Sequence, residues 1–198
     1  MSNEDLWVVI PTATRRQYIP GIIEKAGISK EKIVIVHTIP DNPFYDDVTN
    51  IICADGLNIH RWWNRGLDYV TSKGGRYVAV LNDDVLLEDD PLNKIASTMK
   101  ATGAILGYPY PFQGWVCGYC WIIDLASDIR PDENYKWWYG DRDLDLQAHK
   151  LGPNMVVHVP AKVRHLEGNI LTSQSQELMD LTKIDEELFF SKWNLQKA

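Results

Sequence analysis

The 198-residue sequence has no apolar run approaching the roughly 18 residues that a membrane helix needs. Its first residues form neither a basic segment nor an apolar core, so we expect no signal peptide and a cytoplasmic location. Cysteine is scarce, and an odd count of three without a signal favours reduced thiols (Cys53, Cys117 and Cys120). The net charge of −7 argues against tight, non-specific binding to nucleic acid, which relies on many lysines and arginines.

Short β-branched runs alternate with helical periodicities along the first hundred residues, which is typical of βαβ units. The strands are expected to be buried and largely parallel, because their apolar runs are nearly continuous. They cover residues 6–10, 32–38, 50–53 and 76–82, and helices are expected over 16–26, 58–70 and 91–102. The sequence therefore predicts an α/β fold with a largely parallel central sheet flanked by helices.

The second half has a less regular pattern. It predicts a long strand or bent hairpin over 114–125, a helical face that includes Leu144, Ala148 and Leu151, and strands over 154–160 and 161–168. The tail from residue 171 begins polar and ends in an amphipathic segment. No repeat, low-complexity block or linker divides the chain, so residues 1–198 are interpreted as one domain.

The stretch VAVLNDDV ends a buried strand on Asn82, Asp83 and Asp84. In open α/β sheets, ligands bind beyond the carboxyl ends of the strands. Carboxylate oxygens there suit a hard divalent ion such as Mg²⁺ or Mn²⁺, which can stabilise a diphosphate leaving group. Asp is also common in turns and helix caps, so an acidic surface turn explains this stretch equally well.

Three acids crowd the start of a predicted helix in DRDLDLQAHKLG, at Asp141, Asp143 and Asp145. Capping and the helix dipole favour carboxylates at such a position. Three exceed what a cap needs, and an acid held beside WWYG can serve as a general base toward a hydroxyl group. His165 follows an alternating strand; it is either structural or completes a carboxylate metal site.

Taken in order, six stretches resemble the family-2-type inverting glycosyltransferases of the GT-A (nucleotide-diphospho-sugar transferase) fold. They are VVIPTATRR, DGLNIHRWWNRGLDYV, VAVLNDDV, RDLDLQAHKLG, VVHVPAKVRHLEG and ELFFSKWN. VAVLNDDV is similar to the DxD strand in its Asn-x-Asp form. The resemblance covers nearly the whole chain, and it implies a nucleotide-sugar-binding half at about 1–90, an acceptor half at about 91–170 and a helical tail at 171–198.

The resemblance also implies a role for particular residues. Asp143 would be the catalytic base, and Asp84 and His165 would bind Mn²⁺ or Mg²⁺. The residues expected to contact the nucleotide-diphospho-sugar donor are Pro11, Thr12, Arg16, Asp41, Arg61, Asn64, Asn82 and Asp83. Two positions depart from the family pattern: Trp63 and Arg142 stand where Arg and Glu are usual.

The expected activity is metal-dependent transfer of a sugar to an acceptor hydroxyl on a glycan, a protein or a modified nucleic-acid base. A non-catalytic carbohydrate-binding relic of the fold remains an alternative, since Trp63 and Arg142 replace usual residues. A nucleotidyltransferase is a weaker alternative, because PTATRR lacks the glycines of a phosphate loop. The oligomeric state does not follow from the sequence.

Overall fold

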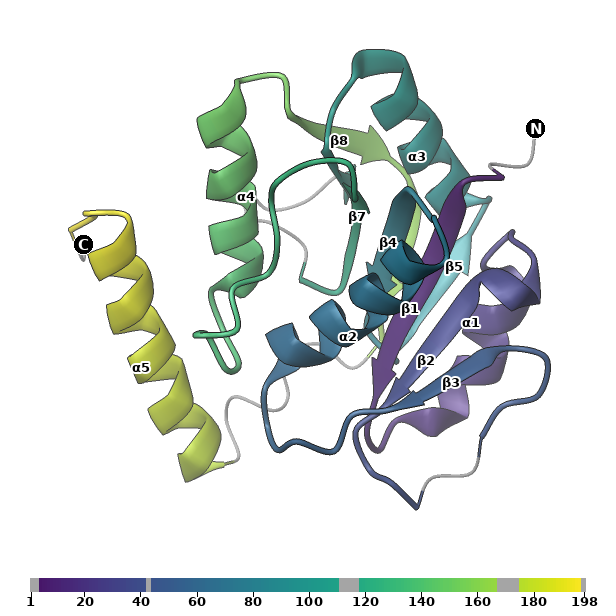
Figure 1. The fold of residues 1–198 in the computed structure, drawn as a ribbon, viewed down its shortest axis with the longest axis horizontal. Helices are drawn as coiled ribbons and strands as arrows, with labels where there is room; N and C mark the ends of the chain where they lie inside the picture. Colours follow the sequence, from purple (N-terminus) through teal and green to yellow (C-terminus); the bar gives the residue numbers. More distant parts are fainter. Residues whose placement is uncertain (1–3, 42–43, 111–117, 167–174, 197–198) are drawn as a thin grey trace.

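A seven-stranded mixed sheet forms the centre of the protein in the computed structural model, which describes residues 4–41, 44–110, 118–166 and 175–196 (Figure 1). The strand order is β3-β2-β1-β4-β7-β6-β8. Strands β1 to β4 are parallel to one another, β7 runs antiparallel to both β4 and β6, and β8 is parallel to β6. The sheet consists of β1 (Leu6–Thr12), β2 (Ile33–His37), β3 (Thr49–Ile52), β4 (Tyr77–Leu81), β6 (Leu106–Tyr110), β7 (Cys120–Asp124) and β8 (Val156–Pro160).

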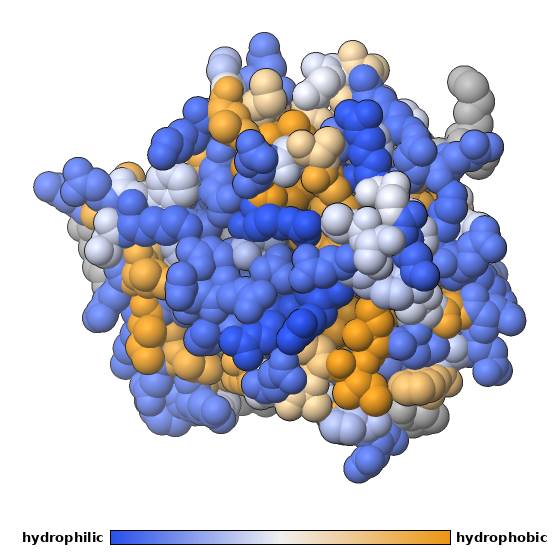
Figure 2. All heavy atoms as spheres, viewed as in Figure 1, coloured by the Kyte–Doolittle hydropathy of each residue, from blue (hydrophilic) through white to orange (hydrophobic). Residues whose placement is uncertain are grey.

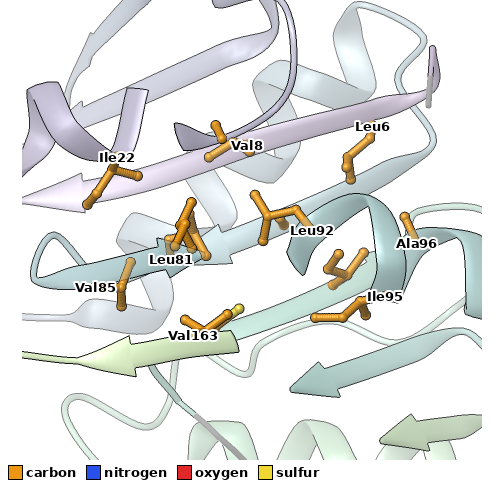
Figure 3. Packing of buried hydrophobic residues seen from close by; sticks show 14 of the residues in the cluster. Leu6, Val8, Ile22, Leu81, Val85, Leu92, Ile95, Ala96 and Val163 are labelled. Atoms are coloured by element: carbon orange, nitrogen blue, oxygen red, sulfur yellow. The ribbon is translucent and has the colours of Figure 1, made fainter. Parts of the chain in front are cut away.

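Helices cover both faces of this sheet. On one face, α1 and α3 pack with a small second sheet against β1 and β4; Figure 3 shows this core, with Ile22, Leu81 and Ile95 among its residues. On the other face, Trp63 and Leu67 of α2 and Leu144 of α4 bury their side chains. The helices are α1 (Ile19–Lys25), α2 (Ile59–Ser72), α3 (Pro91–Thr102), α4 (Gly140–Leu151) and α5 (Gln176–Lys192), with short 3₁₀ helices at Arg16–Tyr18 and Lys30–Lys32.

The second sheet pairs β5 (Val85–Glu88) with β9 (Lys162–His165) in antiparallel register. Val85 lies opposite His165, and the backbone N–H of Leu166 donates to the carbonyl of Asp84 at 2.9 Å. The pairing joins segments about eighty residues apart. It therefore places the end of β9 beside the acidic residues that follow β4.

The predicted α/β architecture is confirmed, and the four expected parallel strands and three expected helices are present with boundary shifts. The sequence analysis missed β5 and β6, which are short strands with no clear period. The predicted strand over 114–125 is found as β7; its residues up to 117 lie outside the described part. The strand expected over 161–168 ends at His165, and residues 167–168 are also outside it.

Hydrophilic residues cover most of the face seen in Figure 2, and hydrophobic residues form small, separate patches on it. Among the described residues, no helix combines the length and the apolar character that crossing a membrane requires.

Candidate functional site

The carboxyl ends of β1 and β4 meet at one edge of the sheet, because these neighbouring strands are parallel. Thr12 ends β1, and its hydroxyl donates to Asp83 Oδ2 at 2.9 Å in the turn after β4. Burial raises the pKa of the Asp83 carboxyl, while the bond from Thr12 opposes the rise. Two predicted donor-site residues, Thr12 and Asp83, are thus held together at the sheet edge where open α/β folds commonly bind ligands.

Asp84 is fully buried beside this pair, and its two oxygens face different groups. Oδ1 lies 2.9 Å from His165 Nε2, whereas Oδ2 pairs with the guanidinium of Arg15. Oδ1 accepts no hydrogen bond of good geometry from the described residues. The Asn82 amide nitrogen is 3.4 Å from the same His165 nitrogen, and the ring of Tyr119 stacks on the imidazole with centroids 4.9 Å apart.

The pair of Asp84 and His165 fits a divalent cation. Two ligands in adjacent octahedral positions about 2.1 Å from Mg²⁺ lie about 3.0 Å apart, close to the separation of Oδ1 and Nε2. A carboxylate oxygen and an imidazole nitrogen are also suitable donors for Mn²⁺. The described residues contain no group of three or more His, Cys, Asp or Glu placed to hold a metal, so the remaining ligands would come from water or from a bound substrate.

Asp141 borders the same edge beside Gly118, just before the start of β7. A Cβ built on Gly118 would lie 2.8 Å from Asp141 Oδ2, so the carboxylate packs directly over the Gly118 backbone. The next residue, Tyr119, accepts the Asn82 N–H and stacks on His165. Burial raises the pKa of Asp141 to about 6, although the backbone N–H of Arg142, which donates to Oδ1 at 2.9 Å, opposes the rise.

Asp143, the predicted base, has different surroundings. Its side chain is fully buried. It accepts hydrogen bonds from Tyr135 at 3.2 Å, Gln147 at 2.7 Å and Trp193 at 2.8 Å, and Lys192 Nζ lies 2.8 Å from Oδ1. These four donors occupy both oxygens. The geometry therefore favours a positioning role for Asp143, whereas Asp141 Oδ2 lies against the Gly118 backbone.

Arg61 and Asn64, predicted to hold the donor, instead bind one acidic side chain. Arg61 Nε donates to Glu133 Oε2 at 3.1 Å, and the Asn64 amide donates to Glu133 Oε1 at 3.0 Å. Asn64 also donates to the Pro131 carbonyl at 2.9 Å. In the described structure these bonds anchor the segment before α4 to α2, which is a structural reason for the Asn at this position.

The other predicted donor residues are spread along the strand ends. Pro11 is buried within β1, opposite Val36. The guanidinium of Arg16 lies 5.0 Å from the ring centroid of Tyr45, whereas that of Arg15 pairs with Asp84 in the acidic turn. Asp41 is exposed in the loop after β2.

Sequence reasoning missed Arg15, Tyr119 and the contribution of α5. The pair Arg15–Arg16 was visible, but nothing in the sequence shows which arginine turns toward Asp84. Asp141 was noticed as a helix-start acid, and its position directly after Gly140 was the available signal. Lys192 and Trp193 bind Asp143 across about fifty residues, a pairing that no local pattern reveals.

No protein-family model and no curated protein matches the sequence. Solved structures match it in fold at low identity. Glucosyl-3-phosphoglycerate synthase of M. tuberculosis has a TM-score of 0.65 at 12% identity, over 98% of this chain and 82% of that one. A nucleotide-diphospho-sugar transferase of Desulfovibrio desulfuricans has a TM-score of 0.57 at 11% identity, over 96% of this chain and 98% of that one.

TarS of S. aureus is a further match, with a TM-score of 0.61 at 14% identity over 79% of this chain. This chain has the GT-A fold. It spans 35% of the length of that TarS chain. A shorter form of TarS, solved in complex with UDP, has a TM-score of 0.60 at 14% identity, over 91% of this chain and 64% of that one.

Proposed function

We propose that the protein is a glycosyltransferase that moves a sugar from a nucleotide-diphospho-sugar to an acceptor hydroxyl with inversion. The observation that carries this proposal is the pair of Asp84 and His165 at the carboxyl edge of a GT-A sheet, with Asp141 packed over Gly118 beside the Tyr119 that stacks on His165. A UDP-sugar is the first donor to test, because TarS, which shares the fold, has been solved with UDP.

A divalent cation, Mg²⁺ or Mn²⁺, would be held by Asp84 and His165 and would supply positive charge to the leaving diphosphate. Thr12, Asn82 and Asp83 would line the donor site, and Pro11 shapes the end of β1. The acceptor oxygen attacks the anomeric carbon as the bond from that carbon to the diphosphate oxygen breaks. The acceptor proton passes to a carboxylate of the chain.

Asp141 is the carboxylate that we assign to this proton transfer, in place of the Asp143 predicted from the sequence. A general base needs a free oxygen within reach of the hydroxyl and a pKa near the working pH. Asp141 has a pKa raised to about 6, whereas both oxygens of Asp143 are already occupied by donors. Trp137 and Trp138, partly exposed just before α4, are suitable surfaces for an acceptor.

The acceptor class stays a proposal with three members: a glycan, a protein side chain or a modified nucleic-acid base. We also propose that the enzyme works in the cytoplasm. Arg142, which departs from the family pattern, lies over the rings of Tyr139 and Phe189 at 5.4 and 5.1 Å, so its charge is directed to aromatic faces.

A thermal-shift screen of nucleotide sugars with and without Mn²⁺ tests the proposal. At about a hundredfold excess over Kd, binding stabilises the fold by about 2.7 kcal/mol, which raises Tm by roughly 5–10 °C for a chain of this size. We expect this rise with a UDP-sugar plus Mn²⁺, and its loss in Asp84→Asn. No shift with any nucleotide would contradict the proposal. A shift without slow donor hydrolysis or transfer would favour the binding relic.

A further inference from the structure

Arg15 contacts the candidate metal pair through Asp84, and this contact was not predicted from the sequence. Its guanidinium bonds Asp84 Oδ2, and its side chain is 16% exposed while that of Asp84 is completely buried. A buried carboxylate needs a compensating charge, because removing it from water is costly. In this structure Arg15 supplies that charge.

The two oxygens of Asp84 have separate partners. Oδ2 faces Arg15 and Oδ1 faces His165 Nε2 at 2.9 Å. A cation between Oδ1 and His165 would therefore leave the bond to Arg15 intact. Arg15 would hold Asp84 as a ligand through one oxygen and would itself lie next to the bound cation.

We propose that Arg15 is a fixed positive charge in the donor site. Because of this charge, the divalent cation binds together with the nucleoside diphosphate. This inference rests on the proposed function. Two positive charges on one carboxylate repel each other, so Arg15 weakens the affinity of the protein alone for Mn²⁺. The negative diphosphate compensates both charges, because it brings an opposite charge next to the guanidinium and the cation.

The coupling is reciprocal by linkage: a diphosphate that strengthens metal binding is itself bound more tightly when the metal is present. Arg16 provides a matched control. It is the neighbouring residue with the same charge, but its guanidinium lies over the Tyr45 ring and its carbonyl accepts the Tyr45 hydroxyl at 3.2 Å.

The test measures Mn²⁺ binding to the protein alone by electron paramagnetic resonance, and UDP binding at saturating Mn²⁺ by calorimetry. Circular dichroism melts establish that each variant folds. We expect Arg15→Gln to bind Mn²⁺ alone about tenfold or more tightly than the original protein, and to bind UDP about tenfold more weakly. The Mn²⁺ and UDP affinities of Arg15→Lys should lie between those of the original protein and of Arg15→Gln. Arg16→Gln should keep the original affinity for Mn²⁺ alone.

The inference would be overturned by an unchanged Mn²⁺ affinity in Arg15→Gln, or by an equal change of Mn²⁺ affinity in Arg16→Gln. The proposed function would remain intact in either case if UDP still binds with Mn²⁺. The inference would also be overturned if the original protein bound UDP equally well with Mn²⁺ and with EDTA, and if Arg15→Gln no longer bound UDP. Arg15 would then replace the metal. Failure of the original protein to bind UDP under any condition would instead contradict the proposed function. In that case the Mn²⁺ titration of the protein alone still decides whether Arg15 competes at Asp84.

Discussion

Asp141 and Asp143 lie two positions apart at the start of α4, yet their surroundings differ. Asp143 is enclosed by Tyr135, Gln147, Lys192 and Trp193. Burial lowers the pKa of Lys192, but the bonds to Asp132 and Asp143 outweigh this effect and raise the pKa above its usual value. The amine therefore stays charged beside Asp143. Burial raises the pKa of Asp141 to about 6, and the nearby charge of Arg142 only partly opposes the rise.

We predict that transfer decreases as the pH falls through about 6, because the base acts only in its ionised form and its pKa is raised to about 6. Asp141→Asn should reduce kcat on the order of 10²–10⁴-fold and leave donor binding intact. Asp143→Asn should lower Tm and keep most of the transfer rate when assayed well below its Tm. A pH–rate profile and steady-state kinetics of both variants provide the measurement.

The reverse result would restore the prediction made from the sequence. Asp143→Asn would then be inactive with unchanged Tm and donor affinity, while Asp141→Asn would retain transfer and the same acidic limb of the pH profile.

Gly140 allows α4 to begin against α2. A Cβ at this position would lie 1.9 Å from His60 Nε2, and His60 is itself buried and fixed by the Tyr135 carbonyl at 3.0 Å. We predict that Gly140→Ala destabilises the protein by about 1–3 kcal/mol, because the extra methyl must displace packed atoms. Chemical denaturation measures the loss.

Gly21→Ala is the control for that change. Gly21 lies within α1, with nothing within 4 Å of a Cβ built there. Alanine should stabilise it by about 0.4–1 kcal/mol, since it restricts the unfolded chain. Equal effects of the two substitutions would show that the His60 contact is not what limits position 140.

At the scale of the element, α5 fixes the segment that leads into α4. Asp185 is fully buried in α5 and accepts the backbone N–H groups of Lys136, Trp137 and Trp138 at 2.7–3.1 Å. Lys192 and Trp193 bind Asp143 from the end of the same helix. Figure 1 shows α5 at the side of the molecule near the start of α4. The helix therefore holds both the aromatic segment and the start of α4.

We predict that Asp185→Ala costs about 3 kcal/mol and lowers Tm by roughly 6–12 °C, because three backbone donors lose a charged acceptor. Glu187→Ala, an exposed change two residues later on the same helix, should alter stability by less than about 0.5 kcal/mol. Thermal unfolding compares the two. Similar small effects would mean that α5 docks through its apolar contacts, such as Phe189, and not through Asp185.

At the scale of the whole molecule, acidic residues outnumber basic ones: 27 Asp and Glu stand against 20 Lys and Arg. Several basic residues of the first β-α-β segment have oxygen partners. Arg15 pairs with Asp84, Lys25 lies 3.5 Å from Glu24, Lys30 lies 3.2 Å from Asp47, and Lys32 donates to the Glu4 carbonyl. With a net charge of −7, the protein has little to attract a phosphate backbone.

We predict no measurable binding to unmodified duplex DNA between about 50 and 200 mM salt, because such binding depends on lysines and arginines that release counterions. Fluorescence anisotropy with a labelled duplex tests this expectation. A salt-dependent affinity would contradict it and would move a modified nucleic-acid base to the front of the acceptor classes.

The predictable parts of the fold were those with strong local patterns. β1, β2, β4 and α3 were found nearly to their ends, because continuous β-branched runs and a Pro91 start are local signals. β5 is four residues long and exists through its pairing with β9, so its formation depends on a partner far away in the chain. The acidic turn and His165 were identified as candidates, but the Arg15 contact and the burial of Asp143 were not.

The sequence by itself determined the α/β class, the strand ends that carry polar side chains, and the set of acids and histidines available for chemistry. These follow from periodicity and residue type, which are properties of short segments. Only the tertiary structure decided which of them meet. Oδ1 of Asp84 faces His165, Arg15 takes the other oxygen, and α5 encloses Asp143 while leaving Asp141 at the edge. Such contacts join segments fifty to eighty residues apart, and burial, charge pairing and hydrogen bonding between them exist only once the chain has folded.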